Sequence, residues 1–211
     1  MSKNAAEIMV THRFECVKST VIRMMSDRGY NYHEETKFKN QKNLTIIAKR
    51  SESSEEKDKI YIFFSLGAKI GVEEFKKFEN LLEEENIRHM IILTNEGLTP
   101  QSSSKLQHLK EIKKQNGITF NVEILTYNKF IRNPTFHEMN KKKRRKLSDE
   151  EKRNLLEKYH LNNLQIPIIF TTDIICQYYG YPIGSVIETE KSYGSIGPGK
   201  TYRIVTENPN K

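Results

Sequence analysis

The stretch "KIYIFFSLGAKIGVEEFKKFENLLEEENIRHMIILT", from Lys59 to Thr94, decides the fold class of the N-terminal part of the chain. Its two ends, "KIYIFFSL" (Lys59–Leu66) and "RHMIILT" (Arg88–Thr94), are continuous apolar runs, which are typical of strands buried on both faces of a sheet. The segment between them, "GVEEFKKFENLLEEEN" (Gly71–Asn86), spaces its apolar residues at helical intervals and predicts a helix. Such a strand–helix–strand unit predicts two parallel strands joined by a right-handed crossover.

The same alternation continues toward the C-terminus. The segment "TPQSSSKLQHLKEIKKQNG" (Thr99–Gly117) opens with Thr-Pro and closes with Asn-Gly, which predicts a capped helix with proline at its first position. A third strand is predicted at "ITFNVEIL" (Ile118–Leu125). Ahead of these elements, the spacing of apolar residues predicts a helix over Ala5–Arg28, and "NLTIIAK" predicts a short strand. Together they predict an α/β N-terminal domain with a partly parallel sheet, spanning residues 1–136.

The composition changes after residue 136. Six consecutive basic residues, "KKKRRK" (Lys141–Lys146), lie in a predicted linker over residues 137–147, and they suit either a solvated linker or a phosphate-contacting patch. Ser148 followed by Glu151 has the spacing of a capping box, which predicts a helix that ends near His160. Short strands and turns follow, so residues 148–211 are predicted to form a small α+β domain.

The segment "GSIGPGKT" (Gly194–Thr201) fits the phosphate-loop pattern GxxxxGK[ST]. A phosphate loop requires a helix to begin at the Lys-Thr pair, but the residues from Tyr202 to Thr206 alternate as a strand does. The segment before the loop is also strand-like. We therefore predict a β-hairpin that binds no nucleotide, with positive φ expected at its glycines, Gly194, Gly197 and Gly199.

Net charge bounds the choice of partners. The 211 residues contain 35 Lys and Arg against 27 Asp and Glu, which gives a formal net charge of +8 and favours a polyanionic partner such as nucleic acid. Cys16 and Cys176 form no CxxC pair, and the six histidines have no metal-ligand spacing, so no metal and no cofactor are expected. No apolar run reaches the roughly 18 residues that span a bilayer, and no signal peptide or membrane partner is expected.

A nuclease is the first enzyme class to consider for a basic α/β chain, because such a chain could cut DNA. Metal-dependent nucleases place carboxylates at the ends of central strands. The strand Lys59–Leu66 contains no acid, the nearest acids (Glu55, Glu56 and Asp58) lie in a polar loop, and Glu123 is the single acid of its strand. The chain is therefore predicted to be non-catalytic.

The C-terminal segment "LQIPIIFTTDIICQYYGYPIGSVIETEK", followed by "TYR", resembles a known family. It is similar to the fifth subunit shared by eukaryotic nuclear and viral DNA-directed RNA polymerases, whose C-terminal half corresponds to a small component of the archaeal RNA polymerase. In the N-terminal part, "RMMSDRGY" and "GLTPQSSSKL" resemble the same family. The chain departs from the family at Ile174, where the family has proline, and in the hairpin from Lys191 to Gly197. The C-terminal residues that carry the resemblance are Ile166, Pro167, Asp173, Tyr178, Tyr179, Gly180, Gly184, Val186, Lys191, Tyr202 and Arg203.

The resemblance implies a structural subunit located in the nucleus, or in a virus factory or virion if the chain is viral. Its C-terminal domain would dock on the largest polymerase subunit through the residues of the motif, and its N-terminal jaw domain would border downstream DNA. A helix that begins after a parallel strand directs its free N–H groups outward at the strand's carboxyl end, so a phosphate contact is expected there as well as an ordinary cap. Its residues are Thr99, Pro100, Gln101, Ser102 and Lys105. The alternative is a stand-alone basic nucleic-acid-binding module.

Overall fold

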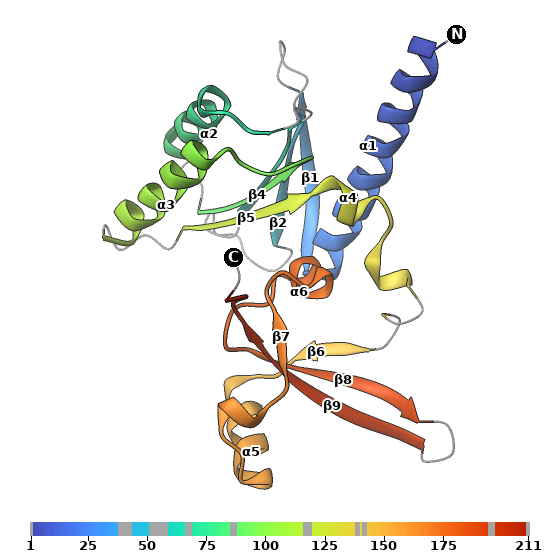
Figure 1. Cartoon of the computed structure of the whole chain (residues 1–211), viewed down its shortest axis with the longest axis vertical. Coiled ribbons are helices and arrows are strands. Elements are labelled where there is room, and N and C mark those ends of the chain that lie inside the picture. The colour runs from blue at the N-terminus through green and yellow to red at the C-terminus, as the bar shows by residue number, and fades with distance from the viewer. Residues whose placement is uncertain are drawn as a thin grey trace. The chain divides into compact units, whose positions relative to one another are not determined.

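The computed structural model describes residues 2–37, 44–50, 59–65, 69–84, 88–115, 120–137, 140, 143–193 and 197–209. The chain forms two compact units, Met1–Arg132 and Asn133–Lys211 (Figure 1). No helix among the described residues is long and apolar enough to cross a membrane.

The N-terminal unit is built on a five-stranded sheet with the strand order β1-β2-β3-β4-β5. Strands β3, β4 and β5 are parallel, while β1, β2 and β3 pair antiparallel. The predicted mixture of helices and parallel strands is therefore confirmed. The elements in chain order are α1 (Ser2–Asp27), β1 (Tyr30–Lys37), β2 (Leu44–Arg50), β3 (Lys59–Phe64), α2 (Val72–Glu84), β4 (His89–Thr94), α3 (Pro100–Gln115), β5 (Asn121–Thr126) and α4 (Tyr127–Phe130).

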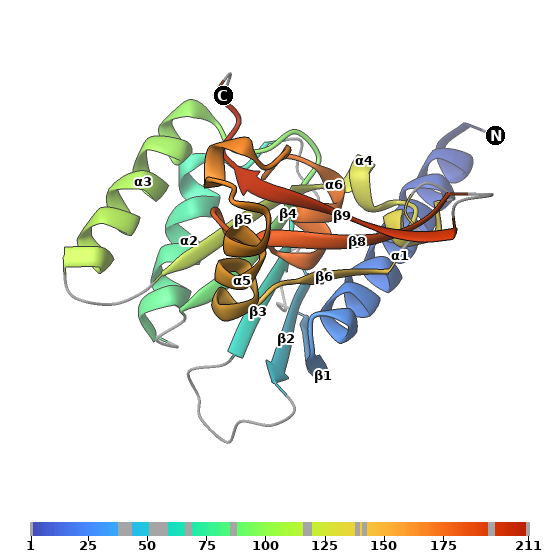
Figure 2. The same cartoon turned by 90° about the horizontal axis from the view of Figure 1, so that it is seen from below.

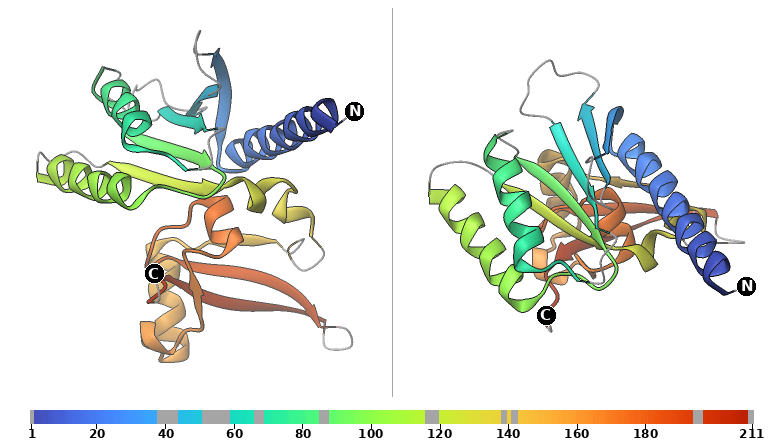
Figure 3. Two further views of the ribbon diagram at one scale, coloured as in Figure 1. Left: turned by 45° about the horizontal axis from the view of Figure 1, so that its top comes forward. Right: turned by 90° about the horizontal axis from the view of Figure 1, so that it is seen from above.

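Both faces of this sheet are covered by helices. Figures 2 and 3 show α2 and α3 along one face of the sheet and α1 along the other. On the first face Phe75 of α2 and Leu106 of α3 pack with Phe63 and Ile92 of the central strands. On the second face Phe14 of α1 meets Phe64 edge-on, with ring centroids 5.5 Å apart. Burial on both faces explains why β3 and β4 are apolar without alternation.

The C-terminal unit is built on a four-stranded sheet with the strand order β6-β8-β9-β7. Strand β7 runs parallel to β9, while β8 pairs antiparallel with both β6 and β9. The elements are two 3₁₀ turns, η2 (Pro134–Phe136) and η4 (Asn163–Gln165), with β6 (Arg144–Lys146), α5 (Asp149–Tyr159), β7 (Ile168–Phe170), α6 (Ile174–Tyr179), β8 (Val186–Tyr193) and β9 (Gly197–Thr206).

The two helices of this unit cover opposite faces of its sheet. On the side of α5, Leu155 and Leu156 pack against Val186 and Ile204. On the side of α6, Cys176 packs against Ile187 and Val205. Successive strand residues point to opposite faces, so even-numbered positions of β8 and β9 face α5 and odd-numbered positions face α6.

The basic run Lys141–Lys146 ends in a strand. Its last three residues form β6, an edge strand of the C-terminal sheet. The main chain is anchored on both sides of this strand, since Glu190 donates to the carbonyl of Lys143 at 3.0 Å and Leu147 donates to that of Val186 at 2.9 Å. An edge strand tolerates charge because one of its sides stays in solvent. The C-terminal unit begins at Asn133.

Candidate functional site

The N-terminus of α3 lies at the carboxyl end of β4, as the Thr-Pro signal predicted. Gly97 adopts a φ of 96° in the connecting loop, a value that glycine allows without strain. The loop is tied to the segment after β3, because Ile70 donates to the carbonyl of Gly97 at 3.1 Å and Thr99 donates to that of Ile70 at 3.2 Å. The start of α3 is thus held by the main chain of two neighbouring connections.

The five residues expected to contact phosphate have different environments. The hydroxyl of Thr99 accepts from the backbone N–H of Ser102 at 3.4 Å and so caps the helix, and it shares a hydrogen bond of 2.9 Å with the hydroxyl of Ser102, which is fully buried and does not face solvent. Pro100 and Gln101 are exposed, and Lys105 is half-buried one turn further on. Of the expected donors, the structure therefore leaves Gln101 and Lys105 accessible at this end of the helix.

A charge cluster that sequence reasoning missed lies at the other end of the parallel strands. Arg28, just beyond α1, donates to both carboxylate oxygens of Glu123 on β5, at 3.0 and 2.8 Å. His89, the first residue of β4, lies 2.9 Å from the same carboxylate. Glu123 is the single acid of β5, but in the folded chain it lies beside Arg28 and His89. No spacing rule finds such a cluster, because Arg28 and Glu123 are 95 residues apart.

Burial and hydrogen bonding act in opposite directions on Glu123. Burial alone would raise its pKa, but the hydrogen bonds from His89 and Arg28 and the charge of Arg28 together lower the pKa to about 2. The carboxylate is ionised at neutral pH, and both of its oxygens accept hydrogen bonds. It serves as a fixed anionic anchor for the end of α1.

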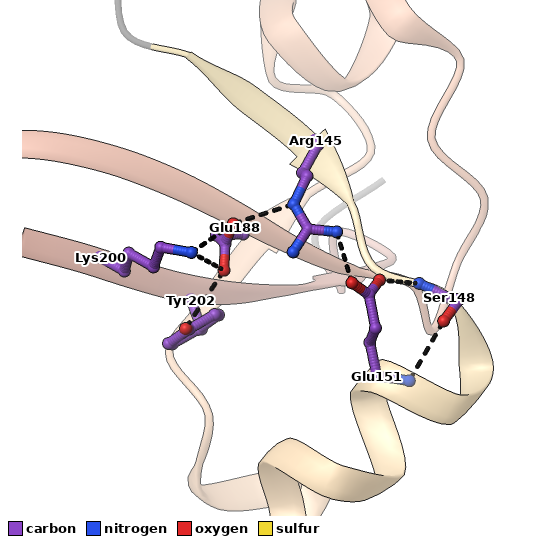
Figure 4. A network of polar contacts seen from close by, with 6 residues as sticks. All are labelled: Arg145, Ser148, Glu151, Glu188, Lys200 and Tyr202. Atoms are coloured by element: carbon purple, nitrogen blue, oxygen red, sulfur yellow. Dashed lines mark hydrogen bonds and ion pairs between the residues drawn. The ribbon is translucent and has the colours of Figure 1, made fainter.

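The C-terminal unit contains a second polar cluster, centred on the buried Glu188 of β8 (Figure 4). Its carboxylate accepts from Nε of Arg145 at 2.9 Å, from Nζ of Lys200 at 3.2 Å and from the hydroxyl of Tyr202 at 3.2 Å. Burial would raise the pKa of Glu188, but the hydrogen bonds from Arg145 and Lys200 outweigh it and leave the pKa below its ordinary value. The cluster ties β6, β8 and β9 together.

Arg145 extends this cluster to the helix that follows. Its Nη1 donates to Glu151 at 2.7 Å, and the other carboxylate oxygen of Glu151 accepts from the backbone N–H of Ser148 at 2.9 Å. Ser148 in turn accepts from the N–H of Glu151 at 3.1 Å, which completes the predicted capping box. The basic run therefore positions the first turn of α5.

The described part of the phosphate-loop pattern lies on a strand, where a phosphate loop requires the start of a helix. Lys200 and Thr201 lie within β9, in antiparallel register with Glu190 and Thr189, so no helix begins there and the predicted hairpin is confirmed. Gly197 has the expected positive φ of 88°. Gly199 does not, because it lies in the strand opposite Lys191 and needs only extended backbone. The third glycine, Gly194, lies outside the described residues.

Lys200→Met tests this interpretation. Lys200 is about half exposed, so we expect the free energy of unfolding to fall by no more than about 1 kcal/mol. The purified full chain should turn over no ATP, with or without the substitution. Urea unfolding and a phosphate-release assay measure the two quantities. Stoichiometric turnover that disappears in the variant would contradict the hairpin interpretation.

The motif "TTDIICQYYGYPIG" is explained mainly by local structure. The carboxylate of Asp173 accepts from the N–H of Ile175 at 2.8 Å and caps α6. Gly180 ends the helix with a φ of 64°, and Gly184 has a φ of 82° in the next turn, so both need glycine's freedom. Tyr178 is fully buried and Tyr179 is half-buried.

The remaining expected docking residues lie on or beside the two inner strands. Tyr202 is half-buried against the α5 side and Arg203 is exposed. Pro167 is exposed, and its carbonyl accepts from the N–H of Ile204 at 2.9 Å. The backbone of Lys191 pairs with Gly199 at the far end of the hairpin. Exposed apolar side chains flank these positions, and they are Leu164, Ile168 and Ile183.

Residues 132–205 match the family profile described as RNA polymerase Rpb5, C-terminal domain. The chain is 30% identical to the DNA-directed RNA polymerases I, II, and III subunit rpabc1 of Dictyostelium discoideum, over 89% of this chain and 94% of the relative. The chain belongs to the Rpb5 family. Other members are similar over most of their length. The subunit RPABC1 of Caenorhabditis elegans is 26% identical over 95% of this chain, and a DNA-directed RNA polymerase subunit 5-like protein of Arabidopsis thaliana is 25% identical over 89%.

Membership in the Rpb5 family confirms the resemblance read from the C-terminal motif. Residues 9–124 also match a family profile described as restriction endonuclease, so the N-terminal part of this Rpb5 family member belongs to that family too. Strands β2, β3 and β4 contain no Asp or Glu, and no group of three or more candidate metal ligands occurs within the described ranges. A shared fold does not by itself carry an activity.

Proposed function

We propose that this chain is a non-catalytic structural subunit of a multisubunit DNA-directed RNA polymerase and that it resides in the nucleus. The observation that carries the proposal is the match to the Dictyostelium polymerase subunit, which spans both units of the chain. The relatives named as polymerase subunits are matched over at least 93% of their length in the three cases given above. Other polymerase subunits are accordingly its partners.

The absence of catalysis is supported by the N-terminal unit. In a nuclease of the matched family, a metal would need acidic ligands at the central strands. The acid of β5, Glu123, already accepts hydrogen bonds from Arg28 on both carboxylate oxygens. The unit retains the layered α/β architecture while its described central strands offer apolar side chains. We infer that the fold serves here as a scaffold.

We also propose that the N-terminal unit acts as a jaw that borders downstream DNA. The contact would be made by the accessible N-terminus of α3, where the helix dipole and Gln101 and Lys105 favour a phosphate. Thr99 takes the role of the helix cap in this proposal, Ser102 is bonded to it, and Pro100 sets the first turn. Such a contact would not distinguish one DNA base sequence from another.

Lys105→Glu tests the DNA contact. Removing one phosphate contact should leave the fold intact. In the assembled polymerase, the slope of log K for DNA against log salt concentration should become shallower by about 1. Lys76→Glu, at an exposed lysine of α2, is the matched control and should change nothing. Photocrosslinking from the duplex ahead of the active centre should reach residues 99–105. Crosslinks that never reach this segment would refute the contact.

The C-terminal unit, in this proposal, docks on the largest polymerase subunit. Arg203 is exposed on β9, beside the exposed Pro167 at the start of β7. Arg203→Ala should lower recovery of the chain with the largest subunit several-fold, because truncated interface cations cost on the order of 1 kcal/mol or more. Arg153→Ala, on the exposed side of α5, is the control. Equal copurification of both variants would count against the docking role.

A stand-alone nucleic-acid-binding module is the second candidate, and the net charge of +8 favours it. Such a module would bind DNA tightly on its own, with a steep salt dependence. A polymerase subunit would bind DNA feebly in isolation but remain in a large complex during native purification. Mass spectrometry of the natively purified complex separates the two.

A further inference from the structure

The C-terminal sheet separates its charges by face. On the α5 side, Arg145, Glu188 and Tyr202 are aligned across β6, β8 and β9. The carboxylate of Glu188 is bonded to Arg145 and Lys200, and Arg145 also pairs with Glu151, so two carboxylates meet two cations on this face (Figure 4). Little charge is left there for a partner to neutralise.

The α6 side has the opposite character. The next row across the sheet aligns Lys146, Ile187 and Arg203. Ile187 is buried against Cys176 of α6, which identifies the face, while Lys146 and Arg203 are exposed on either side of it. In the part of the chain that the structure describes, neither cation has an ion-pair partner.

The neighbouring row adds positive charge and no acid. Arg144 lies on the same face and donates to the carbonyl and the side-chain oxygen of Asn140, at 2.8 and 3.3 Å, both of which are uncharged acceptors. None of the following described positions on this face of the strands is acidic: Arg144, Lys146, Ile169, Ile187, Thr189, Thr201, Arg203 and Val205.

An exposed apolar side chain lies in the turn that adjoins β9. Ile183 is 58% exposed in the turn after α6. The next residue, Gly184, donates its N–H to the carbonyl of Val205 at 2.8 Å, which fixes the turn beside β9 two residues beyond Arg203. Apolar anchors with charged neighbours are characteristic of protein–protein interfaces.

We propose that this face docks on an acidic segment of another polymerase subunit. We call it the cationic face and define it by Lys146, Ile183 and Arg203. The inference rests on the proposed function and adds the chemistry of the partner. Two cations with no ion-pair partner among the described residues, and no acid at the described strand positions of their face, are complementary to Asp and Glu, whereas a neutral or basic partner would leave them unpaired on docking. The apolar Ile183 favours a protein partner over a nucleic acid, whose interfaces are more polar.

Charge reversal of the full-length chain tests the proposal. The double variant Lys146→Glu/Arg203→Glu should bind a polymerase assembled without this subunit at least about 10-fold more weakly, because like charges across an interface cost several kcal/mol. The matched control is Arg153→Glu/Lys158→Glu, which reverses two exposed cations on α5, and it should stay within about 2-fold of the unmodified chain. Poly-L-glutamate should displace the unmodified chain and not the double variant. Hydrogen exchange checks that both variants are folded.

Three outcomes would overturn the inference, and they are distinguishable. Retention of the folded double variant at the level of the unmodified chain would exclude an acidic partner at this face. Binding of the isolated chain to a DNA duplex that the double variant loses, with polymerase retention unchanged, would assign the face to nucleic acid. If the unmodified chain itself is not retained, the proposed function fails and the inference fails with it.

Discussion

Arg28→Met is expected to lower the free energy of unfolding of the N-terminal unit by about 3–5 kcal/mol. The substitution leaves Glu123 ionised and largely buried, with side-chain exposure of 18%, and removes both hydrogen bonds of the guanidinium. Glu123 would keep His89 as a hydrogen-bond partner but lose its cation, and a buried charge without its cation costs more than the lost ion pair itself contributed. Urea unfolding followed by hydrogen exchange in residues 1–132 measures the loss.

Two further variants separate charge from packing. The double variant Arg28→Met/Glu123→Leu should recover most of the stability, because replacing a buried ion pair by apolar groups is often neutral. Arg13→Met removes an exposed arginine of α1 that bonds Asn128 at 2.8 Å, and it should cost about 1 kcal/mol. Equal losses in Arg13→Met and Arg28→Met would mean that burial of Glu123 is unimportant.

The cluster around Glu123 predicts that the free energy of unfolding falls at acid pH, which gives its pH profile an acid limb. The pKa of Glu123 is lowered to about 2 in the folded chain from an ordinary value of 4.5. A depressed carboxyl pKa stabilises the fold above pH 4.5, and this stabilisation is lost as the pH falls toward 2. The total is on the order of 3 kcal/mol. Glu123→Gln should flatten this limb between those pH values, and an unchanged limb would contradict the assignment.

Tyr178→Ala is expected to destabilise the C-terminal unit by about 3–5 kcal/mol, the usual cost of removing a buried aromatic ring. Tyr178 is fully buried, and its ring meets that of Tyr179 edge-on with centroids 5.1 Å apart. Hydrogen exchange in residues 133–211 should rise, since these residues form one compact unit. The variant should also be lost from polymerase, because an unfolded unit cannot dock.

The hydroxyl of Tyr178 contributes little by comparison. It accepts from the amide of Asn133 at 3.4 Å, which is long for a hydrogen bond, so Tyr178→Phe should cost no more than about 1 kcal/mol. Retention of Tyr178→Phe in the polymerase, with loss of Tyr178→Ala, would assign this tyrosine to the core and not to the docking surface. Loss of both variants while the unit stays folded would assign it to the surface.

Strand and helix periodicity predicted much of the N-terminal unit. The apolar runs of β3 and β4 and the capped start of α3 were readable because burial on both faces and helix capping are local properties. The polar strand β1, "YNYHEETK", was not predicted, because it has no apolar alternation and is defined by pairing with β2. Strand β6 was not predicted for the same reason, because its three residues are the last half of a run of six basic residues.

The sequence by itself determined the α/β alternation, the hairpin in place of a phosphate loop, and the family resemblance, because each depends on residues close together in the chain. Tertiary structure alone decided which charges are neutralised. Glu123 meets Arg28 across 95 residues, and Lys200 pairs with Glu188 while Arg203 stays exposed. Strand register places neighbouring residues on opposite faces of a sheet, and only the folded pairing brings an acid to one face and leaves the other cationic.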